Sequence, residues 1–156
     1  MTNVFSPATL AASTLAPMKI PGLRSAHKQV GGIVYFGRML DKIRLHAQGR
    51  LPADYNLGTK SYNEFDSRCT RFLKVPFRAL QKRTIEGGTD LTILRWCFKT
   101  GRKPGKEEIE IWNTFMIKRG WRDSSTPGLE SDKRKAGLGR RTDLGTWFDV
   151  FDADEA

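Results

Sequence analysis

Hydrophobic residues recur at intervals of three or four along most of the chain, which is the spacing of one face of an α-helix. The clearest run has its apolar positions at Ile33, Phe36, Leu40, Ile43 and Ala47. Gly49 follows this run, where a left-handed glycine commonly ends a helix. We therefore predict a helix from about Ile33 to Ala47, preceded by Gly31 and Gly32.

The same reasoning predicts six more helices. One begins at Ser61, because Ser61 and Glu64 have the spacing of a capping box. The others run from Pro76 to Gly87, from Thr89 or Asp90 to Gly101, from Pro104 to Gly120, near Pro127–Ala136 and near Asp143–Phe151. The expected core residues on these helices are Tyr62, Phe65, Cys69, Phe72, Leu73, Phe77, Leu80, Ile85, Leu91, Leu94, Cys97, Ile109, Trp112, Phe115 or Met116, Trp147, Phe148 and Phe151.

No segment shows the alternation of apolar and polar residues that is typical of a strand, and no heptad pattern continues for three cycles. The predicted fold is therefore all-α, an irregular or orthogonal bundle of about six to seven short helices. Within it we expect a flexible lead-in over residues 1–24 and a basic helical body over residues 25–142. A short helix with an acidic C-terminal tail would follow over residues 143–156.

Composition narrows the class of protein. The chain has 156 residues, of which 38% are hydrophobic and 28% charged, as in an ordinary folded domain. No run of about 18 apolar residues occurs, so we expect no membrane span, and we expect the protein to be cytoplasmic. Two cysteines and two histidines are too few for a disulfide scaffold or a typical zinc site, and the sequence indicates no metal and no cofactor.

Charge gives the first indication of a partner. The net charge is +10, and residues 1–120 contain 21 basic against 9 acidic side chains. A basic body suggests a polyanion such as nucleic acid, or an anionic small molecule, although net charge also serves solubility alone. The sequence does not indicate the oligomeric state.

Two groups of residues could form a binding site for an anion. The first comprises Arg38, Arg44, Arg119, Trp121 and Arg122, which would bind an anionic small molecule or nucleotide in a cleft, with a base stacked on the indole. No short catalytic motif occurs, so whether the protein is an enzyme stays open. If it is one, Asp41, His46 and Asp123 are the candidates for proton transfer.

The first group is the favoured interpretation, and the second group is the alternative, which would bind RNA or DNA without sequence readout. Its members step at intervals of three or four along two consecutive predicted helices: Arg68, Arg71, Lys74, Arg78 and Lys82. Such a stripe could neutralise several phosphates of a backbone. For Arg38 and Arg44 the competing interpretation is a solvated helix face with internal ion pairs, and for the second group it is solvation alone. For Arg119, Trp121 and Arg122 it is the end of a helix, where cations are favoured, with Trp121 packed against the core.

Three stretches of the sequence are distinctive: GGIVYFGRMLDKIRLHAQGRLPADYNLG, WCFKTGRKPGKEEIEIWNTFMIKRGWRD and KAGLGRRTDLGTWFDVFDADE. In these stretches the chain resembles an uncharacterised bacterial family, the domain of unknown function 5069. Members of that family often end in Glu-Gly-Arg, whereas this chain ends in Glu155-Ala156. The resemblance implies a small one-domain bacterial protein, and it implies no activity.

Overall fold

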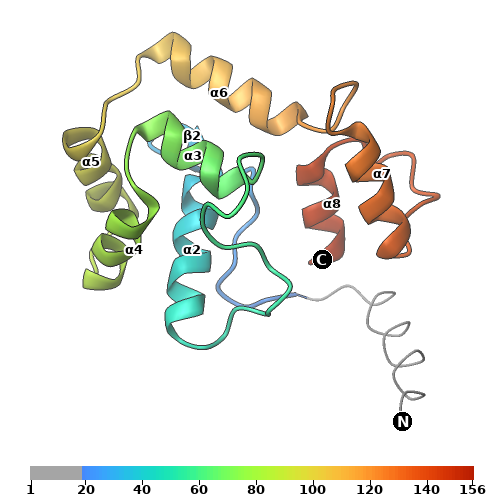
Figure 1. Ribbon diagram of the computed structural model, residues 1–156, viewed down its shortest axis with the longest axis horizontal. Coiled ribbons are helices and arrows are strands. Elements are labelled where there is room, and N and C mark those ends of the chain that lie inside the picture. Colours follow the sequence, from blue (N-terminus) through green and yellow to red (C-terminus); the bar gives the residue numbers. More distant parts are fainter. Residues whose placement is uncertain (1–18) are drawn as a thin grey trace. The chain divides into compact units, whose positions relative to one another are not determined.

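The computed structural model describes residues 19–156 (Figure 1). Residues 1–18, most of the predicted lead-in, lie outside the described part of the chain. The described chain divides into two compact units, one spanning Gly22–Met116 and the other formed by Ile117–Ala156 together with residues 19–21. The predicted division at residues 24 and 142, which followed the composition of the chain, stays a prediction.

Within the described residues the protein has seven helices and one two-stranded hairpin, which confirms the predicted all-α class. The elements are β1 (Gln29–Val30), β2 (Ile33–Val34), α2 (Phe36–Ala47), α3 (Phe65–Leu73), α4 (Phe77–Glu86), α5 (Asp90–Thr100), α6 (Lys106–Lys118), α7 (Thr126–Lys135) and α8 (Trp147–Asp154). None of these helices is long and apolar enough to cross a bilayer.

The hairpin corrects the predicted start of the first helix. Ile33 and Val34 form β2, which pairs antiparallel with β1, and α2 begins only at Phe36. Gly31 and Gly32 occupy the two-residue turn with φ angles of +57° and +82°. A turn with two positive φ values joins two strands tightly, so this glycine pair makes a hairpin instead of introducing a helix.

The predicted capping box is also wrong. Helix α3 begins at Phe65, and its N-cap is Glu64. The hydroxyl of Ser61 instead accepts a hydrogen bond from the backbone N–H of Asn63 at 3.3 Å, and the Ser61 carbonyl accepts one from the Glu64 N–H at 3.2 Å. Ser61 therefore stabilises a turn before the helix, which a serine hydroxyl does as readily as capping a helix.

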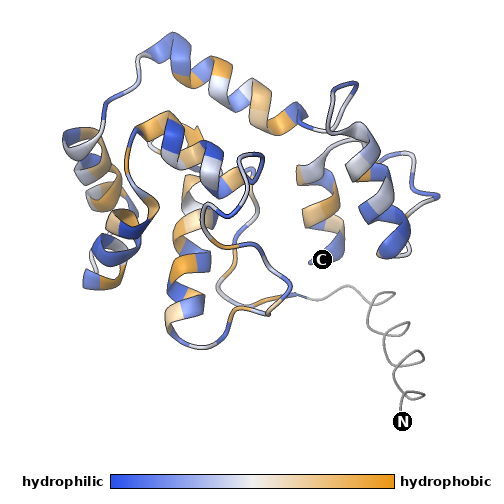
Figure 2. Cartoon of the chain, in the orientation of Figure 1, coloured by the Kyte–Doolittle hydropathy of each residue, from blue (hydrophilic) through white to orange (hydrophobic). Residues whose placement is uncertain are grey.

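The core of the unit Gly22–Met116 lies where α2 packs on α4, α4 packs on α3 and α5, and α5 packs on β1. Figure 2 shows that each helix of the unit mixes hydrophobic and hydrophilic residues. Trp112 is buried as predicted, stacks on Phe72 with 4.5 Å between ring centroids, and donates its indole N–H to the Val34 carbonyl. Three residues expected in the core are exposed instead: Tyr62, Ile85 and Leu91.

The unit that contains Ile117–Ala156 has a small core of its own. Leu129, Leu144 and Val150 are buried together, with three partly buried residues packed against them: Leu138, Trp147 and Ala153. Helix α8 begins four residues later than predicted, because the Thr146 hydroxyl caps it by accepting a hydrogen bond from the Asp149 N–H. Asp149, Asp152 and Asp154, which belong to the predicted acidic tail, lie within this helix.

Candidate functional site

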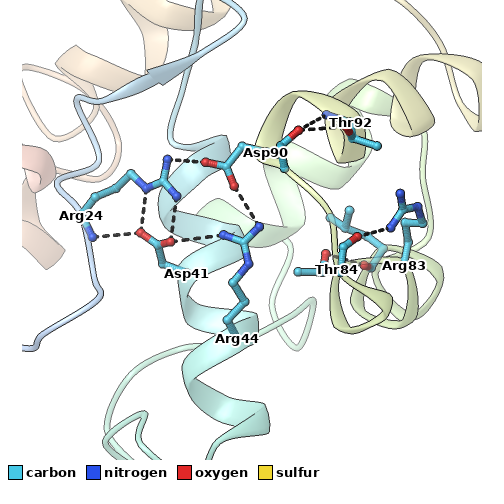
Figure 3. Close-up of polar contacts among 10 residues, drawn as sticks. Arg24, Asp41, Arg44, Arg83, Thr84, Asp90 and Thr92 are labelled. Carbon is cyan, nitrogen blue, oxygen red and sulfur yellow. Dashed lines mark hydrogen bonds and ion pairs between the residues drawn. The ribbon is translucent and has the colours of Figure 1, made fainter.

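The polar side of α2 carries part of the predicted anion site, and it is occupied by ion pairs (Figure 3). Asp41 accepts hydrogen bonds from Arg24 Nε at 2.7 Å and Nη2 at 2.8 Å. Asp90, the first residue of α5, accepts from Arg24 Nη1 at 2.7 Å and from Arg44 Nη2 at 2.8 Å. Arg44 Nη1 lies 3.5 Å from Asp41 and closes the cycle. We call these four residues the arginine–aspartate ring.

A glycine in α2 makes room for this ring. A Cβ atom at position 37 would lie 2.6 Å from Arg24 Nη1, so the guanidinium passes over the helix where Gly37 has no side chain. Asp41 follows Gly37 by one helical turn and therefore lies on the same side. Arg24 lies in the predicted lead-in, residues 1–24, so this contact was not predicted, although a glycine inside a helical pattern often marks a close approach.

The ring favours the charged form of its members. Burial alone would raise the pKa of Asp90, but hydrogen bonds from Arg24 and Arg44 outweigh it, and the pKa is lowered. The hydrogen bond to Asp41 is the main reason that the pKa of Arg24 is raised. An anionic ligand would therefore have to compete with two carboxylates for Arg44.

The remaining predicted residues of α2 differ in their exposure. Arg38 is almost fully buried and donates from Nη1 to the Arg24 carbonyl at 3.2 Å. His46 lies in the last turn of the helix and is exposed. A ligand in solvent could therefore contact His46 directly, whereas burial keeps it from most of Arg38.

A second polar cluster, which the sequence analysis did not predict, is buried around Asp66 of α3. Its Oδ1 accepts a hydrogen bond from the Tyr35 hydroxyl at 2.6 Å and lies 2.9 Å from Lys42 Nζ. Its Oδ2 accepts from the Gly58 N–H at 2.8 Å, while Lys42 Nζ donates to the Asn56 carbonyl at 2.7 Å. We call Tyr35, Lys42 and Asp66 the buried triad. It attaches the segment around residues 56–58 to α2 and α3.

Burial controls the titration of the triad. It raises the pKa of Tyr35 well above the ordinary value, and the nearby Asp66 adds to the rise. Burial also lowers the pKa of Lys42, although Asp66 opposes this change. The sequence did hold a signal for the triad, since Asp66 precedes Cys69 by three residues and so lies on the apolar side of its helix.

Three of the five predicted nucleic-acid-binding residues line one open hollow of about 550 Å³ at the junction of α3 and α4. These are Arg71 on α3, Lys74 just after it and Arg78 in the first turn of α4. The other lining residues are Thr59, Thr70, Val75, Pro76 and Phe77. Among the described residues, no carboxylate lines this hollow. We call it the basic hollow.

Arg71 is held by local contacts, and Lys74 has an unusual backbone conformation. Arg71 donates to the Ser67 hydroxyl at 2.7 Å and to the Tyr62 carbonyl at 2.9 Å, and its guanidinium lies 3.7 Å from the centre of the Tyr62 ring. Lys74 ends α3 in the left-handed conformation, with φ at +56°, which is uncommon outside glycine and asparagine. Glu108 is paired with Arg102 at 2.7 Å, and its pKa is lowered mainly by hydrogen bonds from the Gly105 N–H and from Arg102 and to a smaller extent by the charge of Lys74.

The other two predicted cations lie outside the lining of the hollow. Lys82 is exposed on α4, one turn beyond Arg78. Arg68 is half-buried, donates to Asn63 Oδ1 at 2.9 Å and lies 5.1 Å from the centre of the Phe115 ring. Of the five predicted cations, Arg71, Lys74 and Arg78 therefore line the basic hollow, and Arg68 and Lys82 do not.

The unit that contains Ile117–Ala156 carries the second half of the predicted anion site in a turn after α6. Asp123 organises this turn by accepting the Gly120 N–H at 2.9 Å and the Ser125 N–H at 2.8 Å, and it pairs with Arg119 at 3.2 Å. Burial would raise the pKa of Asp123, but these hydrogen bonds lower it. The Arg119 carbonyl accepts the Trp147 N–H at 3.0 Å, which ties the turn to α8.

Trp121 and Arg122 project from this turn. The Trp121 side chain is 53% exposed although it is large and apolar. Lys118 Nζ lies 5.9 Å and Arg122 Cζ 5.3 Å from its ring, within the range of a cation–π contact. Arg122 has a φ of +50°, a second left-handed residue that is not glycine.

The structure therefore sorts the predicted anion site into two groups, one in each unit. Arg38, Asp41 and Arg44 come together in the unit Gly22–Met116, and a second group lies in the turn after α6: Arg119, Trp121, Arg122 and Asp123. A common cleft would need residues of both units, and it stays a prediction. The proton-transfer candidates Asp41 and Asp123 both accept several hydrogen bonds where they lie.

The cysteines have the structural role that the sequence predicted for Cys69. Cys69 and Cys97 are free thiols and both are buried. Burial raises the pKa of Cys69 well above its ordinary value and that of Cys97 to about 12, so both stay protonated at neutral pH. Over residues 19–156, no group of three or more histidine, cysteine or acidic side chains could hold a metal ion.

Comparison with known proteins adds a family and no activity. A search of curated proteins finds no match to the chain. The model of one protein family, described as a domain of unknown function (DUF5069), matches residues 20–156. That range contains every site residue named above and nearly all of the sequence, so this chain belongs to the DUF5069 family.

Proposed function

We propose that the protein binds the phosphate backbone of nucleic acid, without reading base sequence, through the basic hollow. The observation that carries this proposal is that Arg71, Lys74 and Arg78 line one open hollow whose described lining contains no carboxylate. Such cations attract a polyanion, and each phosphate contact releases counterions from the backbone. The net charge of +10 supports association with such a partner.

The chemistry of the hollow suits a phosphate group. An arginine can donate two parallel hydrogen bonds to one phosphate, while a lysine acts as a point charge. Hydrogen bonds to Ser67 and Tyr62 already hold the guanidinium of Arg71 in one position. Less conformational entropy is therefore lost when a ligand binds.

The start of α4 adds to this field. Pro76 is the N-cap of the helix, and no side chain caps the first turn. The unpaired N–H groups of a helix N-terminus carry a partial positive charge that favours anions. Pro76, Phe77 and Arg78 all line the hollow, so this charge supplements the three side chains.

Binding of an anionic small molecule by Arg38, Arg44, Arg119, Trp121 and Arg122 is the weaker proposal. Arg44 already pairs with two carboxylates, and Arg119 pairs with Asp123. A ligand would have to displace these contacts, whereas a phosphate in the basic hollow displaces no carboxylate from its lining. The two proposals also differ in salt dependence, since a compact anion releases few counterions.

The test is a triple substitution, R71Q/K74Q/R78Q, which removes three charges and keeps most of each side-chain stem. Its matched control is R95Q/K135Q/R140Q, which removes the same residue types from exposed positions outside the hollow. Binding of a fluorescent single-stranded oligonucleotide is measured by anisotropy over a series of salt concentrations. We expect the slope of log K against log salt to fall by about two in the triple variant and to change little in the control.

Two results would overturn the proposal. One is wild-type protein that binds no oligonucleotide at low salt while it binds inorganic triphosphate. The other is an equal loss of affinity and slope in the triple variant and its control, because general charge would then account for all of the binding. Circular dichroism of both variants checks that the helices are retained.

A further inference from the structure

The turn after α6 presents a tryptophan ring to solvent with a cation on either side of it. Trp121 is 53% exposed, while Trp112 is buried and Trp147 has its indole N–H bonded to Ser125 Oγ at 2.6 Å. Lys118 and Arg122 lie on either side of Trp121 in the sequence and within 6 Å of its ring. Neither cation pairs with a carboxylate within the described chain.

The backbone of this turn is held in an uncommon conformation. Gly120 has a φ of +103° and Arg122 one of +50°, and between them Trp121 is turned outward. Thr126 Oγ1 donates to the Gly120 carbonyl at 2.8 Å and accepts the Asp123 N–H at 3.0 Å. A left-handed arginine persists only where its surroundings enforce it, and such residues cluster at binding sites.

Leucine and tryptophan side chains pack around Gly120. A Cβ atom there would lie 3.0 Å from a methyl carbon of Leu129 and 3.1 Å from Trp147. Leu129 and Trp147 thus pack against the turn at Gly120, while Trp121 and Arg122 remain exposed. This is the arrangement expected of a preformed platform, because a ligand would not have to order the turn on binding.

We infer that Trp121 is a stacking platform for an unpaired nucleobase, and that the nucleic acid bound by this protein is therefore single-stranded. The inference rests on the proposed function, because it specifies which kind of nucleic acid the protein binds. Within a duplex both faces of each base are covered by its neighbours, so an indole on the protein surface can stack only on the two terminal base pairs, which a hairpin loop at each end covers in the duplex ligand. In a single strand a base can turn out onto the ring while Lys118 and Arg122 contact the adjoining phosphates.

The inference is tested with three ligands of equal length, about 15 nucleotides, which is within the range of sites on single-strand-binding domains. They are a thymidine oligonucleotide, the same oligonucleotide with abasic sugars throughout, and a duplex closed by a hairpin loop at each end. The abasic strand keeps the phosphates and lacks the bases, so it separates backbone binding from stacking. We expect the wild-type protein to bind the thymidine strand more tightly than the other two.

The variants separate the two surfaces. Trp121→Ala should weaken binding of the thymidine strand by about 5- to 150-fold, the range seen for single stacking residues, and should leave binding of the abasic strand unchanged. Trp121→Phe should retain part of the preference, because the ring is kept. Phe115→Ala, which removes another exposed aromatic ring from α6, should change neither affinity.

Each outcome has one meaning. Equal binding of the thymidine and abasic strands by the wild type, or a preference that survives in Trp121→Ala, overturns the inference and leaves the basic hollow intact. Tighter binding of the duplex than of the thymidine strand overturns it as well. Failure to bind any of the three ligands overturns the proposed function itself.

Discussion

The arginine–aspartate ring and the basic hollow use the same cationic chemistry with opposite results. In the ring, Arg24 and Arg44 each contact both Asp41 and Asp90, and the charges cancel within the fold. In the hollow, Arg71, Lys74 and Arg78 share one surface, and no described carboxylate lines it. Both regions belong to the unit Gly22–Met116.

An arginine on a polar helix face is therefore not in itself evidence of a binding site. What distinguishes the two regions is whether a carboxylate of the described chain forms an ion pair with each cation, which is a property of packing. In the ring each guanidinium is paired with carboxylates of the same unit, whereas the lining of the hollow holds cations and no described carboxylate. Four experiments test this contrast between the two regions.

The largest effect is expected on removing a carboxylate from the ring. Asp41→Ala leaves Arg24 and Arg44 facing each other around one acid, Asp90. Because the guanidiniums are about 30% exposed, we expect a loss of about 2–3 kcal/mol in the free energy of unfolding, below the 3–5 kcal/mol typical of fully buried pairs. Urea denaturation measures it.

Helix propensity does not explain such a loss, because alanine is the best helix former. Asp132→Ala, at an exposed position of α7, is the matched control and should change stability by less than about 0.5 kcal/mol. A similar small change in both variants would mean that the ring contributes no more than ordinary surface ion pairs.

The second effect concerns backbone strain in the hollow. Lys74→Gly relieves a left-handed φ and should raise the free energy of unfolding by about 1 kcal/mol, while it weakens polyanion binding. Lys82→Gly, in the interior of α4, should lower stability by about 1 kcal/mol. Thermal or urea denaturation gives the signs, and a loss of stability in Lys74→Gly would show that its side chain supports the fold.

The third experiment gives the hollow the carboxylate that it lacks. Thr59→Asp adds an acid to the lining and should weaken oligonucleotide binding about fivefold, from roughly 1 kcal/mol of unfavourable charge interaction at contact distance in water. Thr142→Asp adds the same charge at an exposed position in the other unit. Equal weakening by both substitutions would show that total charge, and not the hollow, controls affinity.

The smallest effect is the pH dependence of the ring. The pKa of Asp90 is lowered in the folded protein, so its contribution is present above the unfolded-state pKa of about 3.9 and is lost as the pH falls through the folded value. Asp90→Asn should therefore cost less than about 1 kcal/mol near neutral pH, because the pair is partly exposed.

The difference between wild type and Asp90→Asn should disappear in acid. Unfolding measured from pH 6 down to about pH 2 gives the profile. The variant R71Q/K74Q/R78Q should follow the wild-type acid profile, since no carboxylate lines the hollow. A wild-type profile that stays parallel to that of Asp90→Asn would contradict the assignment.

Much of the fold could be predicted from the sequence because helix signals are local. Helix α4 is an example, because each signal that predicts it lies within a few residues of the helix. Pro76 precedes the helix, Leu80 lies at helical spacing on its apolar side, and Gly87 follows it, and α4 spans Phe77–Glu86 as these signals indicate. The errors occurred where local signals were ambiguous. Gly31 and Gly32 suit a hairpin as well as a helix start, and the Ser61 hydroxyl suits a turn as well as a cap.

The candidate site was predicted less completely. The sequence indicated the cations of the basic hollow, because Arg71, Lys74 and Arg78 recur at helical spacing. It could not indicate that Arg68 lies against aromatic rings, outside the lining of the hollow. The buried triad was missed because Tyr35 and Asp66 are 31 residues apart.

The amino-acid pattern was sufficient to predict the number of helices among the described residues, the approximate position of each and the excess of basic residues. Which cations are neutralised, and that Trp121 is exposed, follow from the packing of the folded chain. Asp90 meets Arg24 across 66 residues of chain, and no periodicity of three or four residues contains that information. An ion pair requires atoms within about 4 Å, and only the packing of α5 beside α2 and the preceding segment brings these side chains so close.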